Sequence, residues 1–196
     1  PISECAQTDP KVPDQCEQDG TCDGAGACRL WISGTVCVDQ TCVGHTLFPD
    51  DLCDGVGECP DSGEQPCDPY NCNDLGNDCR TSCFVDEHCI VGYWCNPINQ
   101  CVAKKDNGEM CGGSNECKSD FCVDGYCCDT ACDGTCEACN IDGLLGECSY
   151  HATYTDPEFE CPPCRLCDGN GECMNVNNGE DAKEDCVQEG EDTCAQ

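Results

Sequence analysis

The peptide Cys22-Asp-Gly-Ala-Gly-Ala-Cys28 decides the fold of this chain, because its frame returns as Cys53-Asp-Gly-Val-Gly-Glu-Cys59 and as Cys167-Asp-Gly-Asn-Gly-Glu-Cys173. Asp-Gly followed by a second glycine is typical of a tight turn, since glycine adopts positive backbone dihedrals at low cost. Each copy therefore places two cysteines at the ends of a turn. A unit that returns in this way indicates an array of small modules.

The cysteine spacing around the first two copies is also repeated, as C-x5-C-x8-C-x4-C and C-x5-C-x7-C-x4-C. A longer period is superimposed, because Thr8-Asp9-Pro10 returns as Thr155-Asp156-Pro157 ahead of the third copy. From these repeats we predict the end of a preceding repeat at 1–21, two copies of the module at 22–78, a disulfide knot at 79–102, a linker at 103–110, a knot containing Cys127-Cys128 at 111–148, a linker at 149–166, and a third module that starts the next superrepeat at 167–196.

Composition determines how such a chain can fold. Its 196 residues include 30 cysteines, and 40 Asp and Glu stand against 8 Lys and Arg, which gives a formal charge of -32. Apolar burial on this scale cannot offset the conformational entropy of folding, so cross-links must supply the difference. Disulfides persist in oxidising compartments, and we therefore expect an extracellular or cell-surface location.

The short gaps between cysteines leave no room for long helices, and short strands joined by tight turns are the economical alternative. Asp124-Gly125 suits the positive dihedrals of a type I′ turn, so residues 121–127 are predicted to form a hairpin. Residues 34–43 and 92–102 are predicted to form slightly longer hairpins. The expected fold class is small and disulfide-rich, mainly short β-hairpins and irregular loops, in an elongated tandem modular array with little helix.

The series from Cys79 to Asn140, with its CDGxGxC flanks, resembles the cysteine-rich repeats of secreted and surface proteins from myxobacteria and related bacteria. This resemblance covers residues 8–194 and is most specific between Cys122 and Cys139. It implies an extracellular location and a structural or adhesive role. Residues 79–128 also resemble the small disulfide knots of Dickkopf and colipase-type domains, from which no receptor-binding residue carries over.

Cofactor and enzyme chemistry find little support in the sequence. Covalent haem needs C-x-x-C-H, which is absent, so we expect no haem. Cys161, Cys164 and Cys167 form a run that could hold zinc or an iron–sulfur cluster, but disulfides are the favoured interpretation in so cysteine-rich a chain. The three histidines lie in unrelated modules without a nucleophile signature, and we expect no catalytic residue and no enzyme activity.

Calcium is the more serious ligand hypothesis, because oxygen donors are plentiful. Two stretches alternate Asn and Asp around a glycine, although neither fits an EF-hand loop and such residues also form turns for backbone reasons. The candidate calcium ligands are Asp68, Asn71, Asn73, Asp74, Asp78, Asn175, Asn177, Glu180 and Asp181. The cysteines assigned to structural disulfides are Cys22, Cys28, Cys37, Cys42, Cys53, Cys59, Cys67, Cys72, Cys127, Cys128, Cys161, Cys164, Cys167 and Cys173.

The sequence thus favours an extracellular structural protein, a rigid disulfide-stapled repeat unit of a fibre, adhesin or surface matrix. Its expected partners are copies of itself or the rest of a longer repeat chain. The net charge repels nucleic acid and anionic membranes, and no apolar run is long enough to cross a bilayer. The alternatives are a secreted disulfide-rich binding module for a receptor or protease, and a calcium-binding matrix protein.

Overall fold

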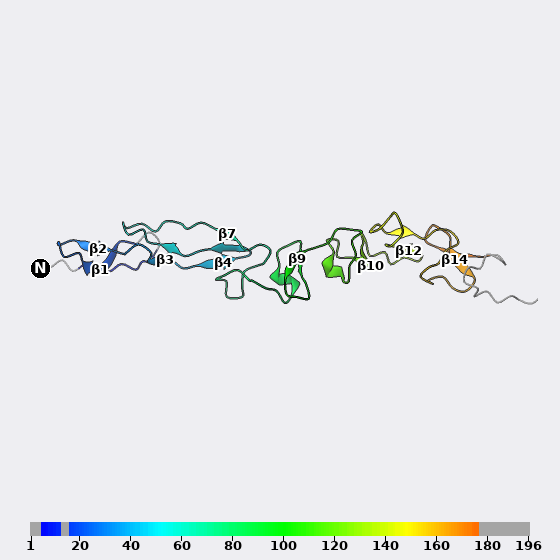
Figure 1. Cartoon of the computed structure of the whole chain (residues 1–196), viewed down its shortest axis with the longest axis horizontal. Coiled ribbons are helices and arrows are strands. Elements are labelled where there is room, and N and C mark those ends of the chain that lie inside the picture. Colours follow the sequence, from blue (N-terminus) through cyan, green and yellow to red (C-terminus); the bar gives the residue numbers. More distant parts are fainter. Residues whose placement is uncertain (1–4, 13–15, 177–196) are drawn as a thin grey trace, which may run out of the picture. The chain divides into compact units, whose positions relative to one another are not determined.

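The computed structural model describes residues 5–12 and 16–176. The chain divides into two compact units, Pro1–Val102 and Ala103–Gln196. Each unit consists of short antiparallel strand pairs joined by turns (Figure 1). The helical segments of the described part are two single 3-10 turns, η1 (Asp86–His88) and η2 (Ser114–Glu116). The expected fold class, short hairpins and loops stapled by disulfides with almost no helix, is confirmed.

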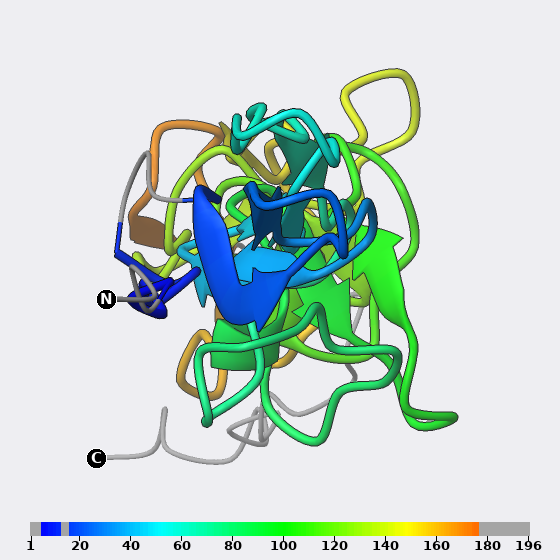
Figure 2. The same ribbon diagram turned by 90° about the vertical axis from the view of Figure 1, so that its left-hand side faces the viewer.

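The described residues of the first unit form four small sheets. Its strands are β1 (Gln18–Cys22), β2 (Cys28–Leu30), β3 (Val36–Val38), β4 (Thr41–Val43), β5 (Thr46–Phe48), β6 (Asp51–Leu52), β7 (Gln65–Pro66), β8 (Tyr93–Cys95) and β9 (Cys101–Ala103). The pairs are β1 with β2, β3 with β6 and β8 with β9, and β4, β5 and β7 form a three-stranded sheet in that order. The β1–β2 hairpin, drawn in blue in Figure 2, closes across the first CDGxGxC copy.

Up to residue 176, the second unit contains three two-stranded sheets. Its strands are β10 (Cys122–Val123), β11 (Tyr126–Cys127), β12 (Glu137–Ala138), β13 (Ser149–Tyr150), β14 (Arg165–Cys167) and β15 (Cys173–Asn175). They pair in sequence order, β10 with β11, β12 with β13 and β14 with β15. The β14–β15 hairpin closes across the third CDGxGxC copy, with Cys167 opposite Cys173.

Two of the three predicted hairpins are present, and the first of them has the predicted turn at Asp124-Gly125. Asp124 and Gly125 have φ of 52° and 81°, and Val123 lies opposite Tyr126 across the turn. These dihedrals agree with the type I′ turn expected from the Asp-Gly pair. The β8–β9 hairpin likewise forms within the region predicted at 92–102.

Residues 34–43 do not form the predicted hairpin. β3 pairs with β6 and β4 with β5, so the chain reverses at Gly44, just outside the predicted segment. Gly44 supplies a φ of 65°, whereas residues 35–43 contain no glycine. The Gln40 N–H donates to Asp50 Oδ1 at 2.6 Å, which holds the two arms of the longer hairpin together where the ladder is interrupted.

Disulfide sulfur takes the place of a hydrocarbon core. Every buried apolar residue of the described part is a cysteine, apart from Ala138 and Leu166. Trp31 packs against one buried cysteine cluster, and Tyr70 and Tyr93 pack against another. The aromatic rings therefore cover disulfides and do not form a core of their own.

The two stretches predicted as linkers make defined contacts. Between residues 103 and 110, Lys105 donates its backbone N–H to Glu116 O at 2.7 Å, and its Nζ lies 2.5 Å from Glu116 Oε2. Gly108 N–H donates to Cys127 O at 2.8 Å. Between residues 149 and 166, the buried Asp156 carboxylate accepts the N–H groups of Glu160 and Cys161, at 2.9 and 3.0 Å.

Candidate functional site

The three CDGxGxC copies fold into the same turn, and we refer to them as the first turn (22–28), the second turn (53–59) and the third turn (167–173). In each, the aspartate carboxylate accepts the backbone N–H groups two and four residues further along the chain. The distances are 2.7 and 3.0 Å at Asp23, 2.7 and 3.1 Å at Asp54, and 2.7 and 3.1 Å at Asp168. The sequence repeat is therefore also a repeat of structure.

These hydrogen bonds change the acidity of the three carboxyl groups. The pKa of Asp23, Asp54 and Asp168 is lowered in each case, chiefly by the N–H group two residues along the chain. A donated hydrogen bond stabilises the charged carboxylate more than the neutral acid. Both glycines of every turn have positive φ, between 83° at Gly24 and 109° at Gly57, which explains why glycine occupies these positions.

The closing cysteine of each turn, at its C-terminal end, follows one pairing rule. It forms a disulfide with a cysteine that precedes its own turn in the chain. The pairs are Cys5–Cys28, Cys37–Cys59 and Cys161–Cys173. These disulfides fasten each turn to the strand or loop that leads into it.

The opening cysteine, at the N-terminal end, makes a longer connection. In the second turn Cys53 bonds to Cys16, which lies ahead of the first turn, with a separation of 37 residues. In the third turn Cys167 bonds to Cys136 in the preceding block, with a separation of 31 residues. The opening cysteine therefore links its turn to the block before it.

The first turn departs from this rule. Cys22 is exposed and is a free cysteine, whereas its counterparts Cys53 and Cys167 are 1% and 0% exposed. Its sulfur lies 3.5 Å from the sulfur of Cys5, which belongs to the closing disulfide of the same turn. Of the cysteines assigned to structural disulfides from the sequence, all but Cys22 and Cys164 lie in disulfides between described residues.

Two groups of neighbouring cysteines that could resemble metal sites are occupied by disulfides. Cys16, Cys37 and Cys53 lie within 4.8 Å of one another, yet all three are in disulfides. In the C-x-x-C-x-x-C run, Cys161 and Cys167 are likewise bonded to partners outside the run. Two of the three thiolates that a zinc or iron–sulfur site would use there are thus already committed.

The first candidate calcium stretch uses its side chains for local hydrogen bonds. Asn71 donates its amide to Glu87 O and Cys89 O, at 2.9 and 2.8 Å. The Asn73 amide bonds the side chain and backbone of Asn77, and Asp78 accepts the N–H of Cys79 at 2.8 Å. Asp74 pairs with Arg80, and Asp68 is exposed. The Asn71 bonds attach the loop to the neighbouring η1 segment, and the others act within the loop.

The second candidate stretch lies mostly outside the described residues. Asn175 Oδ1 accepts a hydrogen bond from Arg165 Nε at 3.0 Å. Asn177, Glu180 and Asp181 fall beyond residue 176, where the description of the chain ends.

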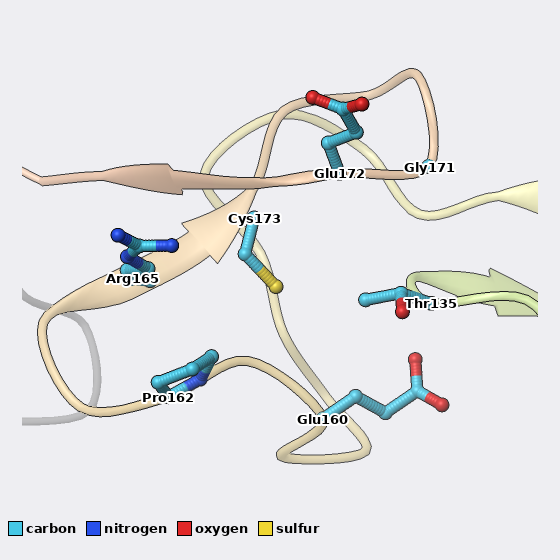
Figure 3. A pocket seen from close by; sticks show the side chains of 7 residues that line it. All are labelled: Thr135, Glu160, Pro162, Arg165, Gly171, Glu172 and Cys173. Carbon is cyan, nitrogen blue, oxygen red and sulfur yellow. The ribbon is translucent and has the colours of Figure 1, made fainter.

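A hollow of about 380 Å³ lies beside the third turn (Figure 3). Its lining side chains include Glu160, Arg165 and Glu172. Glu160 Oε2 accepts the N–H of Cys136 at 2.6 Å, and Arg165 bonds Asn175, so both polar groups serve the local fold. The sulfur that faces the hollow belongs to Cys173, which is in a disulfide and cannot act as a nucleophile.

One histidine is buried in the second unit. His151 is 7% exposed, and its Nε2 has no hydrogen-bond partner. Glu158 Oε1 lies 3.9 Å from this nitrogen. Burial, with the nearby Asp124 charge, raises the pKa of Glu158. The pair is a local electrostatic contact and does not resemble a nucleophile with its base.

The long links of the opening cysteines are the feature that sequence reasoning did not identify. Spacing alone leaves many possible pairings, so it could not reveal that Cys53 and Cys167 share a role. The available signal was their common place directly before Asp-Gly in each copy.

Among the described residues, no helix has the length and apolarity needed to cross a bilayer. Comparison of the chain with models of protein families, with curated proteins and with solved structures finds no match.

Proposed function

We propose that the chain is an extracellular structural protein, a rigid disulfide-stapled repeat unit of a fibre, adhesin or surface matrix, with no enzyme activity. The heavy disulfide bonding itself suggests an oxidising, extracellular environment. The more specific role rests on the way in which the disulfides connect successive blocks.

The opening cysteines are the observation that carries this proposal. The Cys16–Cys53 and Cys136–Cys167 disulfides both join a turn to an earlier block. Such a bond resists extension of the chain, because the two blocks are linked by sulfur as well as by backbone. A repeat protein whose neighbours are joined in this way transmits tension through covalent bonds, which suits a fibre or an anchoring matrix.

The distribution of exposed apolar side chains favours assembly between copies rather than a single binding surface. The most exposed include Val56, Leu75 and Val91 in the first unit, at 75%, 82% and 101%, and Met110 and Phe159 in the second, at 72% and 75%. They occur in successive blocks of both units. A receptor or protease ligand of the secreted binding-module type instead concentrates its apolar contacts in one patch.

The charge of the chain favours covalent linkage between repeats. At a formal charge of -32, adjacent copies repel one another through their surfaces. Disulfides or divalent cations can offset this repulsion, so a calcium-dependent matrix is a variant of the same proposal.

Electron microscopy of the natively secreted material, first in calcium and then after chelation, tests the proposal. Filaments or sheets in both conditions support a polymer held by covalent bonds and protein contacts. Filaments that disappear on chelation support a polymer in which calcium joins the copies. Single particles of uniform size in both conditions would contradict the structural role and favour the secreted binding module.

A further inference from the structure

In the second and third turns, the opening cysteine forms a disulfide. The opening cysteine of the first turn, Cys22, has no disulfide partner among the described residues. In the second turn, the sulfurs of Cys16, Cys37 and Cys53 gather within 4.8 Å, where the closing disulfide meets the opening one. In the third turn, the sulfurs of Cys136 and Cys161 lie 3.5 Å apart for the same reason. The meeting of two disulfides is thus the common architecture of a complete turn.

The first turn has every part of this architecture except the incoming cysteine. The closing disulfide Cys5–Cys28 is present, and Cys22 lies 3.5 Å from it through Cys5. The Asp23 hydrogen bonds match those of the other turns. The turn is therefore folded and its opening cysteine is in place, yet Cys22 is exposed where its counterparts are buried.

We propose that Cys22 accepts a disulfide from a cysteine of an equivalent module outside the described residues. The incoming cysteine occupies the role that Cys16 has for the second turn and Cys136 has for the third. It belongs either to a second copy of this chain or to another part of the same polypeptide. This inference rests on the proposed function, which it deepens by naming the bond that joins one repeat array to the next.

The bond forms by ordinary thiol–disulfide chemistry with a disulfide oxidant, such as a thiol oxidoreductase or a small-molecule disulfide. The incoming thiolate first attacks the oxidant and forms a mixed disulfide, which releases one oxidant thiol. The Cys22 thiolate then attacks the sulfur of the incoming cysteine, and the second oxidant thiol leaves. Two cysteine thiols are oxidised and one oxidant disulfide is reduced to two thiols. The two cysteine protons pass to the departing oxidant thiolates.

Disulfide mapping of the natively secreted protein tests this assignment. Free thiols are blocked with N-ethylmaleimide before unfolding, and the unreduced chain is then cleaved on the N-terminal side of aspartate. Cleavage before Asp19 and before Asp23 leaves Cys22 as the only cysteine of its peptide, so this peptide reports the partner of Cys22. We expect the Cys22 peptide to be linked to a peptide that contains neither Cys5 nor Cys28. Mixing isotopically light and heavy chains before oxidation gives hybrid masses for a second copy and uniform masses for the same polypeptide.

Two results would overturn the inference: a Cys22 peptide that carries N-ethylmaleimide, or one linked to Cys5 or Cys28 within the first turn. A Cys22→Ser variant should lose the linked peptide while the closing disulfide remains, and Ala25→Ser is the matched control that keeps it. The inference and the proposed function fail separately. Filaments with a blocked Cys22 would remove only the inference, and a linked Cys22 in closed dimers would remove only the fibre.

Discussion

The knot between Cys83 and Cys101 closes on itself, whereas the Cys16–Cys53 disulfide encloses the first turn and most of the strands of its unit. The knot uses two disulfides of separation 12, Cys83–Cys95 and Cys89–Cys101. The longer disulfide has a separation of 37. A second knot, from Cys111 to Cys127, repeats the compact arrangement with separations of 11 and 10. One chain therefore combines knots that are complete locally with segments that depend on their neighbours.

This difference shows what each kind of disulfide does for the array. A local disulfide limits the conformations of about a dozen residues and leaves the rest of the chain unaffected. A long disulfide restricts the unfolded chain over a much greater contour, and its loop-closure contribution rises with length. The knots act as spacers, and the long disulfides hold successive blocks together.

Removing the long disulfide should give the largest effect. The chain-entropy relation gives about 3.8 kcal/mol for a separation of 37 and about 2.8 kcal/mol for a separation of 12. We therefore expect Cys16→Ser/Cys53→Ser to reduce the free energy of unfolding more than the matched control Cys83→Ser/Cys95→Ser. Guanidinium unfolding of both variants, with all other disulfides intact, measures the difference.

Limited proteolysis of the same two variants shows which residues unfold when each disulfide is removed. Cleavage in the Cys16–Cys53 variant should spread through residues 17–52, while cleavage in the control should stay within residues 84–94. An equal or larger loss of stability in the control, or cleavage beyond its knot, would erase the distinction between local and long disulfides.

A smaller loss of stability is expected from substitution of Gly146, which lies where residues 128–148 approach the backbone of Gly108. A Cβ on Gly146 would lie 2.0 Å from Gly108 N, and the position has φ of 83°. Gly125 has a similar φ of 81° within the second knot, but nothing lies within 4 Å of a Cβ there. Gly125→Ala should therefore cost about 1 kcal/mol for the left-handed backbone, and Gly146→Ala about 3 kcal/mol because it adds a backbone clash.

Thermal unfolding of the two glycine variants, at one pH and with disulfides intact, checks this ranking. Equal midpoints for Gly125→Ala and Gly146→Ala would mean that the 128–148 segment moves away from Gly108 at little cost. In that case the contacts between segments matter less than the turns within them.

The smallest expected effect is the pH dependence of the turns. The lowered pKa of Asp54 means that its stabilising contribution is complete above the ordinary aspartate pKa of about 3.9 and is lost as pH falls through the lower folded value. The stability difference between the native chain and Asp54→Asn should therefore shrink as the pH falls below about 4. Melting curves from neutral pH into acid measure it.

The matched control is Asp61→Asn, which removes the same charge from a carboxylate that accepts a single backbone N–H, from Gly63 at 2.7 Å. If Asp61→Asn and Asp54→Asn change the stability below about pH 4 equally, the shared turn geometry has no special electrostatic role.

Local structure could be predicted from the sequence wherever a turn residue imposes it. Asp124-Gly125 fixed a hairpin through its own dihedrals, and the Asp-Gly pairs of the three turns gave matching hydrogen bonds. Residues 34–43 were predicted wrongly because the whole hairpin was placed ahead of Gly44, the glycine at which the chain reverses. The disulfide partners of cysteines far apart in the sequence could not be predicted, because cysteine spacing does not show which sulfurs meet.

The sulfur-filled interior also bears on how the stability of this protein varies with temperature. The heat capacity change of unfolding arises mainly from exposure of hydrocarbon, at about 12–15 cal/mol/K per residue in ordinary globular domains. In the described part of the chain, the buried apolar residues are almost all half-cystines. Their cross-links remain when the oxidised chain unfolds and limit the apolar surface that unfolding exposes. We therefore expect a small heat capacity change of unfolding and hence a flat stability curve. Such a chain should keep its fold in the cold, where proteins that depend on hydrocarbon burial lose stability.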